Sequence, residues 1–222
     1  MRSYWETDNW KTEAAELAER FPQLTIRPDR DRGGITITGR LPVTNDVEYS
    51  VSIELSPGYP RVVPVMRCDP QEVEPLRDRH INEQSGEACL CVRSELRLHW
   101  PLGSSIAQFI DRLVTPFLDG QFYYDTQGHW PAERQRLHGV PGIIEAYRDF
   151  CTQLGNDSLE TIEQLMRLLA RKNNPKGHEL CPCGSGGRLR NCHADAIKQL
   201  RHVIEPEHAM LDLRDCFPGS AR

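Results

Sequence analysis

The residues from 47 to 55 alternate strictly between apolar and polar side chains. In an extended chain successive side chains point to opposite faces, so one face of this segment is expected to be apolar and the other polar. A strand with one buried face and one wet face is typical of an antiparallel sheet. Residues 24–26, 35–38 and 62–66 are shorter strand candidates in the same part of the chain. We therefore predict a four-stranded antiparallel sheet.

Helices are predicted before and after these strands, because apolar side chains recur there at helical spacing. They span residues 8–21, 104–118, 143–154, 157–172 and 194–204. Asp8 and Asp157 are the predicted caps of two of them, and Pro116 is expected to kink the end of another. Residues 119–140 and those from Pro206 onward are predicted to be irregular. This order indicates an α+β fold, with helices packed on one face and at the ends of the sheet.

Composition and charge disfavour several classes of protein. The net charge of -5 argues against a general binder of nucleic acid or anionic membranes. No apolar run approaches the roughly 20 residues of a membrane-spanning helix, and the first residues lack the apolar core of a signal peptide. We therefore expect a cytoplasmic protein. In that reducing compartment, the eight cysteines indicate metal binding or thiol chemistry and not a disulfide framework.

The stretch between residues 67 and 100 shows no period, and a loop of that length inside a compact domain is usually functional. It contains the segment His80-Ile-Asn-Glu-Gln-Ser-Gly-Glu-Ala-Cys-Leu-Cys91, and Trp100 follows nine residues later. Cys89 is the candidate nucleophile. His80 and Asn82 are polar groups of catalytic type close to it in the sequence.

This part of the chain resembles the ubiquitin-conjugating enzyme (UBC) family. Pro57-Gly-Tyr-Pro60 with Val63-Pro64 is similar to the family's tyrosine-proline turn and proline strand, His80-Ile-Asn82 to its His-Pro-Asn element, and Gly86-Glu-Ala-Cys-Leu90 to its Gly-x-x-Cys-Leu segment. Trp100-Pro101 resembles the tryptophan that closes the loop. Ile81 stands where the family has proline, and the asparagine-to-cysteine spacing is one residue shorter. The resemblance implies a UBC-like fold over roughly residues 8–150.

The stretch of residues 128–139 is more similar to bacterial UBC-like proteins, which include the conjugating-type proteins of anti-phage cyclic-nucleotide (CBASS-type) operons. The partner there is a cGAS-like nucleotidyltransferase whose C-terminus is handled like that of ubiquitin. The resemblance implies that Cys89 accepts an acyl group from a partner's C-terminus as a thioester, which an amine then attacks. The sequence carries no nucleotide-binding loop, so any ATP-dependent activation is expected to come from a separate protein.

Several roles around Cys89 stay open. Asn82 is a candidate donor to the developing oxyanion, and His80 is expected to fix the loop by hydrogen bonds to the backbone and not to act as a base. Cys91 is either a packed thiol or a second thiol that exchanges a thioester or disulfide with Cys89. The alternative for Cys89 itself is an inert buried thiol. A further alternative is a zinc site in this loop, formed by His80, Cys89, Cys91 and His99. The spacing of these four residues matches no established zinc-binding pattern.

A second cysteine-rich stretch, residues 178–193, reads His-Glu-Leu-Cys-Pro-Cys-Gly-Ser-Gly-Gly-Arg-Leu-Arg-Asn-Cys-His. Cys181, Cys183, Cys192 and His193 supply four soft ligands, which suit a closed tetrahedral zinc site of structural role. The stretch closely resembles the SEC-C motif, found at the C-terminus of the SecA translocation ATPase and attached to many bacterial proteins. A segment this short cannot bury a core, so metal binding is expected to supply its folding free energy. Several basic residues lie in or near this stretch: Arg188, Arg190, Lys198, Arg201 and His202. They either form a surface that binds a protein or RNA partner, or they are ordinary solvated charges.

We predict two parts: a UBC-like conjugating domain with C-terminal helices over residues 1–172, and a linker, zinc segment and tail over residues 173–222. The leading hypothesis is a transferase in which Cys89 carries an acyl group. The main alternative, favoured by Ile81 and the short spacing, is a catalytically inactive UBC-like adaptor that binds such a partner non-covalently. A third hypothesis is a zinc-tailed nucleic-acid or ribosome-associated factor, which the net acidity disfavours.

Overall fold

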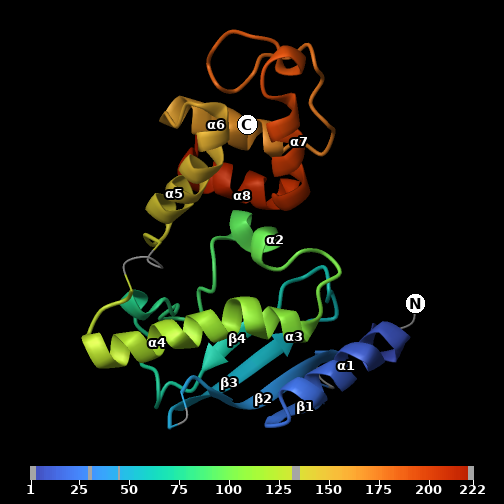
Figure 1. Cartoon of the computed structure of the whole chain (residues 1–222), viewed down its shortest axis with the longest axis vertical. Coiled ribbons are helices and arrows are strands. Elements are labelled where there is room, and N and C mark those ends of the chain that lie inside the picture. The colour runs from blue at the N-terminus through green and yellow to red at the C-terminus, as the bar shows by residue number, and fades with distance from the viewer. Residues whose placement is uncertain (1–3, 30–31, 45, 132–135, 220–222) are drawn as a thin grey trace. The chain divides into compact units, whose positions relative to one another are not determined.

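The computed structural model describes residues 4–29, 32–44, 46–131 and 136–219. Over these residues the fold is α+β with a four-stranded antiparallel sheet, as predicted. The strands are β1 (Leu24–Asp29), β2 (Gly34–Pro42), β3 (Glu48–Leu55) and β4 (Val65–Cys68). The helices are α1 (Asp8–Arg20), α2 (Leu96–His99), α3 (Ile106–Phe109), α4 (Thr115–Gln127), α5 (Val140–Cys151), α6 (Leu159–Leu169), α7 (Ala194–Val203) and α8 (Pro206–Cys216) (Figure 1).

The chain folds into two compact units. The first, which we call the sheet unit, consists of Met1–Leu90 and Leu102–Gln135. The second, the helical unit, consists of Cys91–Pro101 and Arg136–Arg222. Packing therefore groups residues 136–172 with the cysteine-rich stretch, whereas the sequence interpretation placed them with the sheet. The functional boundary at 172/173 stays a prediction.

The sheet has its strands in sequence order, each antiparallel to the next. The register aligns Ile37 of β2 with Ile53 of β3, and Ile53 with Met66 of β4. All three side chains are buried, so a continuous apolar row crosses the sheet. The alternation predicted for residues 47–55 is confirmed within β3, where Tyr49, Val51, Ile53 and Leu55 are buried and the residues between them are more exposed.

Helix α1 begins one residue earlier than its predicted cap implies. Thr7 is the N-cap, because its Oγ1 accepts a hydrogen bond from the backbone N–H of Trp10 at 3.3 Å. Asp8 is the first helical residue, so its prediction as the cap was wrong. The carboxylate of Glu13 then ties α1 to the start of α3: it accepts from the Tyr4 hydroxyl at 2.5 Å and from the Ile106 N–H at 3.0 Å.

Helices α3 and α4 form one continuous rod in the sheet unit (Figure 1). A wider π-helical turn, Ile110–Val114, joins them and lies just before Pro116, which has no N–H to donate. The rod continues to Gln127, so the prediction of irregular structure was wrong for residues 119–127. Residues 128–131 and 136–139 do lie outside helices and strands, and residues 132–135 of that stretch lie outside the described residues.

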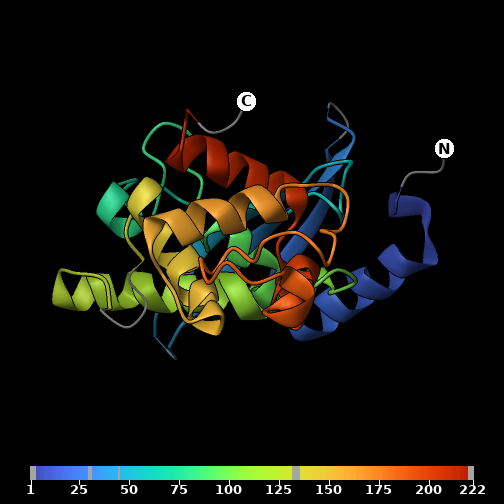
Figure 2. The same ribbon diagram turned by 90° about the horizontal axis from the view of Figure 1, so that it is seen from above.

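The helical unit contains α5 to α8, and α6 packs beside α8 (Figure 2). Ser158 caps α6, since its Oγ accepts from the N–H of Thr161 at 3.2 Å; the predicted cap, Asp157, precedes it. Helix α8 occupies residues that were predicted to be irregular. Pro206 starts this helix, which fits the preference of proline for the first helical turn. Among the described residues, no helix has the length and apolar character to span a membrane.

Candidate functional site

Three cysteines and a histidine come together at the start of α7. The ligand atoms of Cys181, Cys183, Cys192 and His193 all lie within 4.8 Å of one another. Cys181 and Cys183 are buried, His193 is half-buried and Cys192 is exposed. In the part of the chain that the structure describes, no second set of three or more such groups gathers in this way. The predicted set is therefore assembled and could hold a metal ion.

The spacing of these atoms fits tetrahedral coordination. Sγ of Cys181 and Sγ of Cys192 each lie 3.3 Å from Nδ1 of His193, and Sγ of Cys183 lies 3.6 Å from Sγ of Cys192. With metal–sulfur bonds of about 2.3 Å and a metal–nitrogen bond of about 2.05 Å, the ligand atoms of a tetrahedron are roughly 3.6–3.8 Å apart. These three separations differ from the tetrahedral values by only a few tenths of an ångström, and every remaining pair lies within 4.8 Å, so the four atoms are close enough to converge on one ion.

Hydrogen-bond donors surround the sulfur atoms. The Ser185 hydroxyl lies 3.1 Å from Sγ of Cys183 and 3.5 Å from Sγ of Cys192, and Gly187 N–H donates to the same hydroxyl oxygen at 3.3 Å. Burial raises the pKa of the Cys181 thiol. Burial acts in the same direction on Cys183, but the hydroxyl and backbone N–H of Ser185 outweigh it and bring that pKa below the ordinary value. Ser185 therefore favours the thiolate of Cys183, the form that binds a metal, whereas burial opposes that form at Cys181.

A small hairpin brings together the two halves of residues 178–193, which we call the metal-binding stretch because its four ligands could hold an ion. Cys181 N–H donates to the carbonyl of Gly187 at 2.9 Å, which closes the turn between them. Within the turn, Gly184 and Gly186 have φ values of +79° and +73°. Only glycine adopts this left-handed conformation freely, so the two glycines allow the chain to fold back around the thiols.

Asn156, in the turn between α5 and α6, holds this hairpin from outside. Its Nδ2 donates to the carbonyl of Cys183 at 2.9 Å, and its Oδ1 accepts from Ser158 N–H at 3.1 Å. Sequence reasoning missed both Asn156 and Ser185. The position of Ser185 inside a Gly-Ser-Gly turn beside a cysteine was an available signal. Asn156 gave none, because 27 residues separate it from Cys183.

The metal-binding stretch shares a hydrophobic core with the helices around it. Cys181, Cys183 and Leu189 belong to one cluster of buried side chains that also includes Tyr147, Phe150, Leu154, Ile162, Leu165, Met166, Ile197, Leu200 and Leu213. The stretch is therefore a structural part of the helical unit. Its four ligands and the packing of α5 to α8 are expected to stabilise one another.

Arg201 of α7 reinforces this arrangement. Its guanidinium donates to the backbone carbonyls at the C-terminal end of α6, including Leu168 at 3.3 Å, Arg171 at 2.9 Å and Lys172 at 3.3 Å. These carbonyls have no partner within a helix, so a cation there satisfies them and complements the helix dipole. Arg201 therefore joins α7 to the end of α6. This structural role differs from both roles expected from the sequence, a partner-binding surface and an ordinary solvated charge.

The candidate nucleophile Cys89 lies in the sheet unit, at the base of a tight hairpin. Cys89 N–H donates to the carbonyl of His80 at 2.7 Å, and Asn82 N–H donates to the carbonyl of Glu87 at 2.9 Å. Ala88 N–H donates to the carbonyl of Met66 in β4 at 2.9 Å. The hairpin is thus joined to the edge of the sheet, which fixes the backbone on both sides of the thiol.

His80 has a structural setting. Its backbone is left-handed, with φ 54°, and its side chain is buried with the ring centroid 4.6 Å from that of Trp130. Trp130 lies directly over Gly120 of α4, where a Cβ atom would stand 2.4 Å from the indole ring. The neighbouring Arg79 donates to Oε1 of Gln121 in α4 at 3.1 Å. These contacts secure the start of the hairpin against α4.

The Cys89 thiol is exposed. Partial burial of its surroundings, together with the carboxylate of Glu87, raises the pKa of the thiol above its ordinary value. Glu87 is in turn paired with Arg67 of β4 at 3.0 Å, and Arg67 also donates to the carbonyl of Ser85 at 3.1 Å. Cys89 is therefore accessible but is mostly a thiol at neutral pH, and it becomes more nucleophilic as the pH rises.

The other predicted site residues occupy different settings. The side-chain oxygen of Asn82 accepts from the backbone N–H groups of Gln84 and Ser85 at 2.9 and 3.0 Å, an Asx turn that shapes the tip of the hairpin. Cys91 is half-buried and belongs to the helical unit. The alternative zinc set is divided between the units, with His80 and Cys89 in one and Cys91 and His99 in the other. Cys89 and Cys91 are also assigned to different units, so the exchange of a thioester or disulfide between them stays a prediction.

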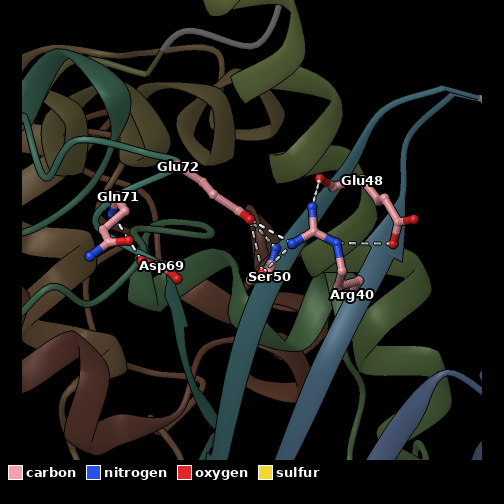
Figure 3. A network of polar contacts seen from close by, with 6 residues as sticks. All are labelled: Arg40, Glu48, Ser50, Asp69, Gln71 and Glu72. Atoms are coloured by element: carbon pink, nitrogen blue, oxygen red, sulfur yellow. Dashed lines mark hydrogen bonds and ion pairs between the residues drawn. The ribbon is translucent and has the colours of Figure 1, made fainter.

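A charged network fixes the segment that leaves β4 (Figure 3). The Glu72 carboxylate accepts from Ser50 N–H at 2.7 Å and from Arg40 at 2.6 Å, and Arg40 also pairs with Glu48 at 3.2 Å. Burial alone raises the pKa of Glu72, but the hydrogen bonds from Ser50 and Arg40 lower it overall, so the carboxylate stays ionised. The loop toward His80 therefore begins from a fixed point on the polar face of the sheet.

No protein-family model, curated protein or solved structure matches this chain.

Proposed function

We propose that the chain is a UBC-like transferase in which Cys89 carries an acyl group as a thioester. The proposal rests on the resemblance of residues 57–101 to the UBC family and on the α+β order of elements before and after the cysteine. The observation that carries it is the exposed thiol of Cys89 on a hairpin whose backbone is held on both sides.

In the proposed reaction, the Cys89 thiolate attacks the carbonyl carbon of an activated C-terminal acyl group on a partner protein. A carbon–sulfur bond forms, and the leaving group of the activated acyl departs with the electron pair of the bond that breaks. An amine then attacks the thioester, loses a proton to solvent, and expels the Cys89 thiolate as the amide forms. The thioester is already activated, so no strong base beside the cysteine is required.

The partner in this proposal is a protein with a conjugatable C-terminus. The resemblance to bacterial UBC-like proteins favours a cGAS-like nucleotidyltransferase and a role in anti-phage defence. The sequence of this chain has no nucleotide-binding loop, so any ATP-dependent activation of the acyl group is expected to come from a separate protein.

We propose further that the ion at Cys181, Cys183, Cys192 and His193 is zinc, in a SEC-C-type motif of structural role. Three thiolates and an imidazole in a tetrahedron are the donor set and geometry that Zn²⁺ takes in structural sites. The four ligands leave no coordination position for a substrate. Metal analysis of the purified protein by mass spectrometry tests this assignment, and one zinc per chain, lost in Cys183→Ala, is the expected result.

Intact-mass spectrometry of the protein co-expressed with its genomic neighbours tests the transferase proposal. We expect a mass adduct that thiol reagents remove. This adduct should be absent in Cys89→Ala and should persist as a stable ester in Cys89→Ser. Cys68→Ser is the matched control, because burial raises the pKa of that half-buried thiol to about 12 and makes it unreactive. A thiol-sensitive adduct without the serine trap would indicate a disulfide between partners and contradict the proposal.

The second candidate is an inactive UBC-like adaptor. One observation favours it: the raised pKa of the Cys89 thiol, which reduces the thiolate fraction. In this case the partner co-purifies without a covalent adduct, and Cys89→Ala leaves partner-dependent activity intact. The same co-expression experiment therefore separates the two candidates.

A further inference from the structure

The segment Cys91–Pro101, which we call the anchor segment, begins two residues after Cys89 but packs with the helical unit. Ser94, Glu95, Leu96 and Arg97 are buried, and Trp100 is 1% exposed. Buried charged groups in a segment this short need partners from elsewhere in the unit. The anchor segment therefore owes its conformation to the helices that surround it.

Ion pairs link the anchor segment to α8. Arg93 pairs with Asp212 at 2.7 Å and also with Asp215. Arg97 pairs with Glu205, the residue before α8, at 3.2 Å, and its guanidinium lies 5.3 Å from the ring centroid of Trp100. Asp212 is fully buried and also accepts from the Tyr147 hydroxyl at 3.2 Å. Removing α8 from its place would take these carboxylates away from Arg93, which is half-buried, and would separate the buried Arg97 from Glu205.

A second link joins the anchor segment to α5. Glu95 pairs with Arg136 at 2.6 Å, and the same guanidinium pairs with Asp149 of α5 at 2.6 Å. Val92, at the start of the anchor segment, packs against the hydrophobic cluster that contains Cys181, Cys183 and Leu189. The anchor segment and the metal-binding stretch are thus parts of one packed core (Figure 1 shows α2 of the anchor segment next to α8).

We propose that occupancy of the metal site controls the order of the anchor segment, and with it the backbone that begins two residues after Cys89. The route runs from the ligands into α7, through Arg201 to the end of α6, and from α6 to α8 and its ion pairs with Arg93. A structural metal supplies binding free energy comparable with the whole stability of a small domain, so its loss loosens everything that shares its core. The inference goes beyond acyl transfer and does not require it.

Hydrogen–deuterium exchange of the full chain, read by mass spectrometry, tests the proposal. The zinc-loaded protein is compared with protein from which a chelator has removed the metal, with metal content measured in both. Amides of the anchor segment, such as Trp100 N–H bonded to the Leu96 carbonyl at 2.7 Å, are expected to exchange about tenfold faster or more without metal. Peptides from β2 and β3 are the internal control and should be unchanged.

Cys192→Ser removes one ligand at an exposed position, so it alters packing little and should reproduce the effect of the chelator. Cys216→Ser is the matched control in the same unit, because it makes the same chemical change at a residue that is not a ligand. Unchanged exchange of the anchor segment in metal-free protein would overturn the proposal. Equal loss of protection across β2 and β3 would overturn it as well, since the metal would then hold the whole chain.

Coupling between two sites is reciprocal, which gives a second and independent measurement. Arg93→Ala removes the ion pairs to Asp212 and Asp215, and it should weaken zinc binding by about threefold to tenfold in competition with a chromophoric chelator. Arg40→Ala, which removes a comparable set of ion pairs in the sheet unit, is the control and should leave zinc affinity unchanged. Equal zinc affinity in Arg93→Ala and the unmodified protein would contradict the coupling.

Discussion

The two cysteine sites place the same side chain in opposite environments. In the helical unit, the hydroxyl and backbone N–H of Ser185 approach Cys183, and four ligand atoms converge. In the sheet unit, Cys89 stands alone on its hairpin, exposed, with the carboxylate of Glu87 nearby. The first site favours the thiolate of Cys183, whereas the second presents a thiol to solvent. Whether a cysteine is held as a thiolate or remains a thiol therefore depends on its neighbours. Hydrogen-bond donors beside the sulfur favour the thiolate, and a carboxylate nearby favours the thiol.

The comparison implies that the two sites contribute very differently to stability. Cys183→Ala removes a ligand from the shared core, and we expect a loss on the order of 5–10 kcal/mol, enough to unfold the helical unit. Cys89→Ala changes an exposed side chain and should alter the free energy of unfolding by less than about 0.5 kcal/mol. Chemical denaturation followed by circular dichroism measures both. Similar small losses in the two variants would remove the distinction.

The next largest effect is expected at Arg201, which joins the helix after the metal ligands to the end of α6. Arg201→Ala should lower the free energy of unfolding by about 1–3 kcal/mol, because charged hydrogen bonds to helix carbonyls are lost. Lys198→Ala, on the same helix at an exposed position, should have little effect. Thermal unfolding of the zinc-loaded variants measures the difference, and equal midpoints would show that Arg201 is not a structural link.

Ser185 gives a finer test of the claim that its hydroxyl favours the thiolate of Cys183. Ser185→Ala removes a hydroxyl that lies within hydrogen-bond distance of two sulfur atoms but keeps all four ligands, and we expect zinc affinity to fall by about tenfold. Ser185→Thr keeps the hydroxyl and should retain most of the affinity. Competition with a chelator of known affinity provides the measurement. An unchanged affinity in the alanine variant would assign the hydroxyl to the turn alone.

The smallest predicted effect concerns the Cys89 thiol. Burial and, less strongly, the Glu87 carboxylate raise its pKa, so Glu87→Gln should lower the pKa part of the way toward the ordinary value and increase the thiolate fraction. Alkylation at pH 8 should then be faster by about twofold to threefold, and in the unmodified protein the rate should still be rising above pH 9. Glu83→Gln, at the tip of the same hairpin, is the control. A slower rate in Glu87→Gln would show that the carboxylate positions the thiol by other means.

The sequence was most informative where one local pattern determined the structure. The alternation over residues 47–55 predicted β3 because burial on one face leaves a mark at every second residue. The ligand spacing likewise predicted which side chains gather into a set that could hold a metal ion. The part of α4 beyond Leu118 was missed because the apolar and aromatic residues of this helix are not confined to one stripe. Helix α8 was missed because Pro206 was taken as the end of structure when it is the start of a helix.

Other features depended on contacts that no local pattern records. The caps differed by one residue from those predicted, Thr7 for Asp8 and Ser158 for Asp157, since which polar side chain caps a helix depends on backbone angles. The capture of residues 91–101 by the helical unit rests on partners more than 100 residues away, such as Asp215 for Arg93. The metal-binding stretch was expected to lack a core, and it shares one because distant helices supply it.

The crossing of the chain between its two units has a consequence for synthesis. The anchor segment leaves the ribosome before residues 205–215, which provide the carboxylate partners of Arg93 and Arg97, have been made. At about 5–20 residues per second, Trp100 and Arg97 wait on the order of ten seconds for α8. During that interval the sheet unit, which ends at Leu90 and resumes at Leu102, can fold. Residues 91–101 then remain a loop that lacks its α8 partners. The four candidate ligands, within residues 181–193, are made shortly before α8, so the order of synthesis presents the ligands first and the last helix afterwards.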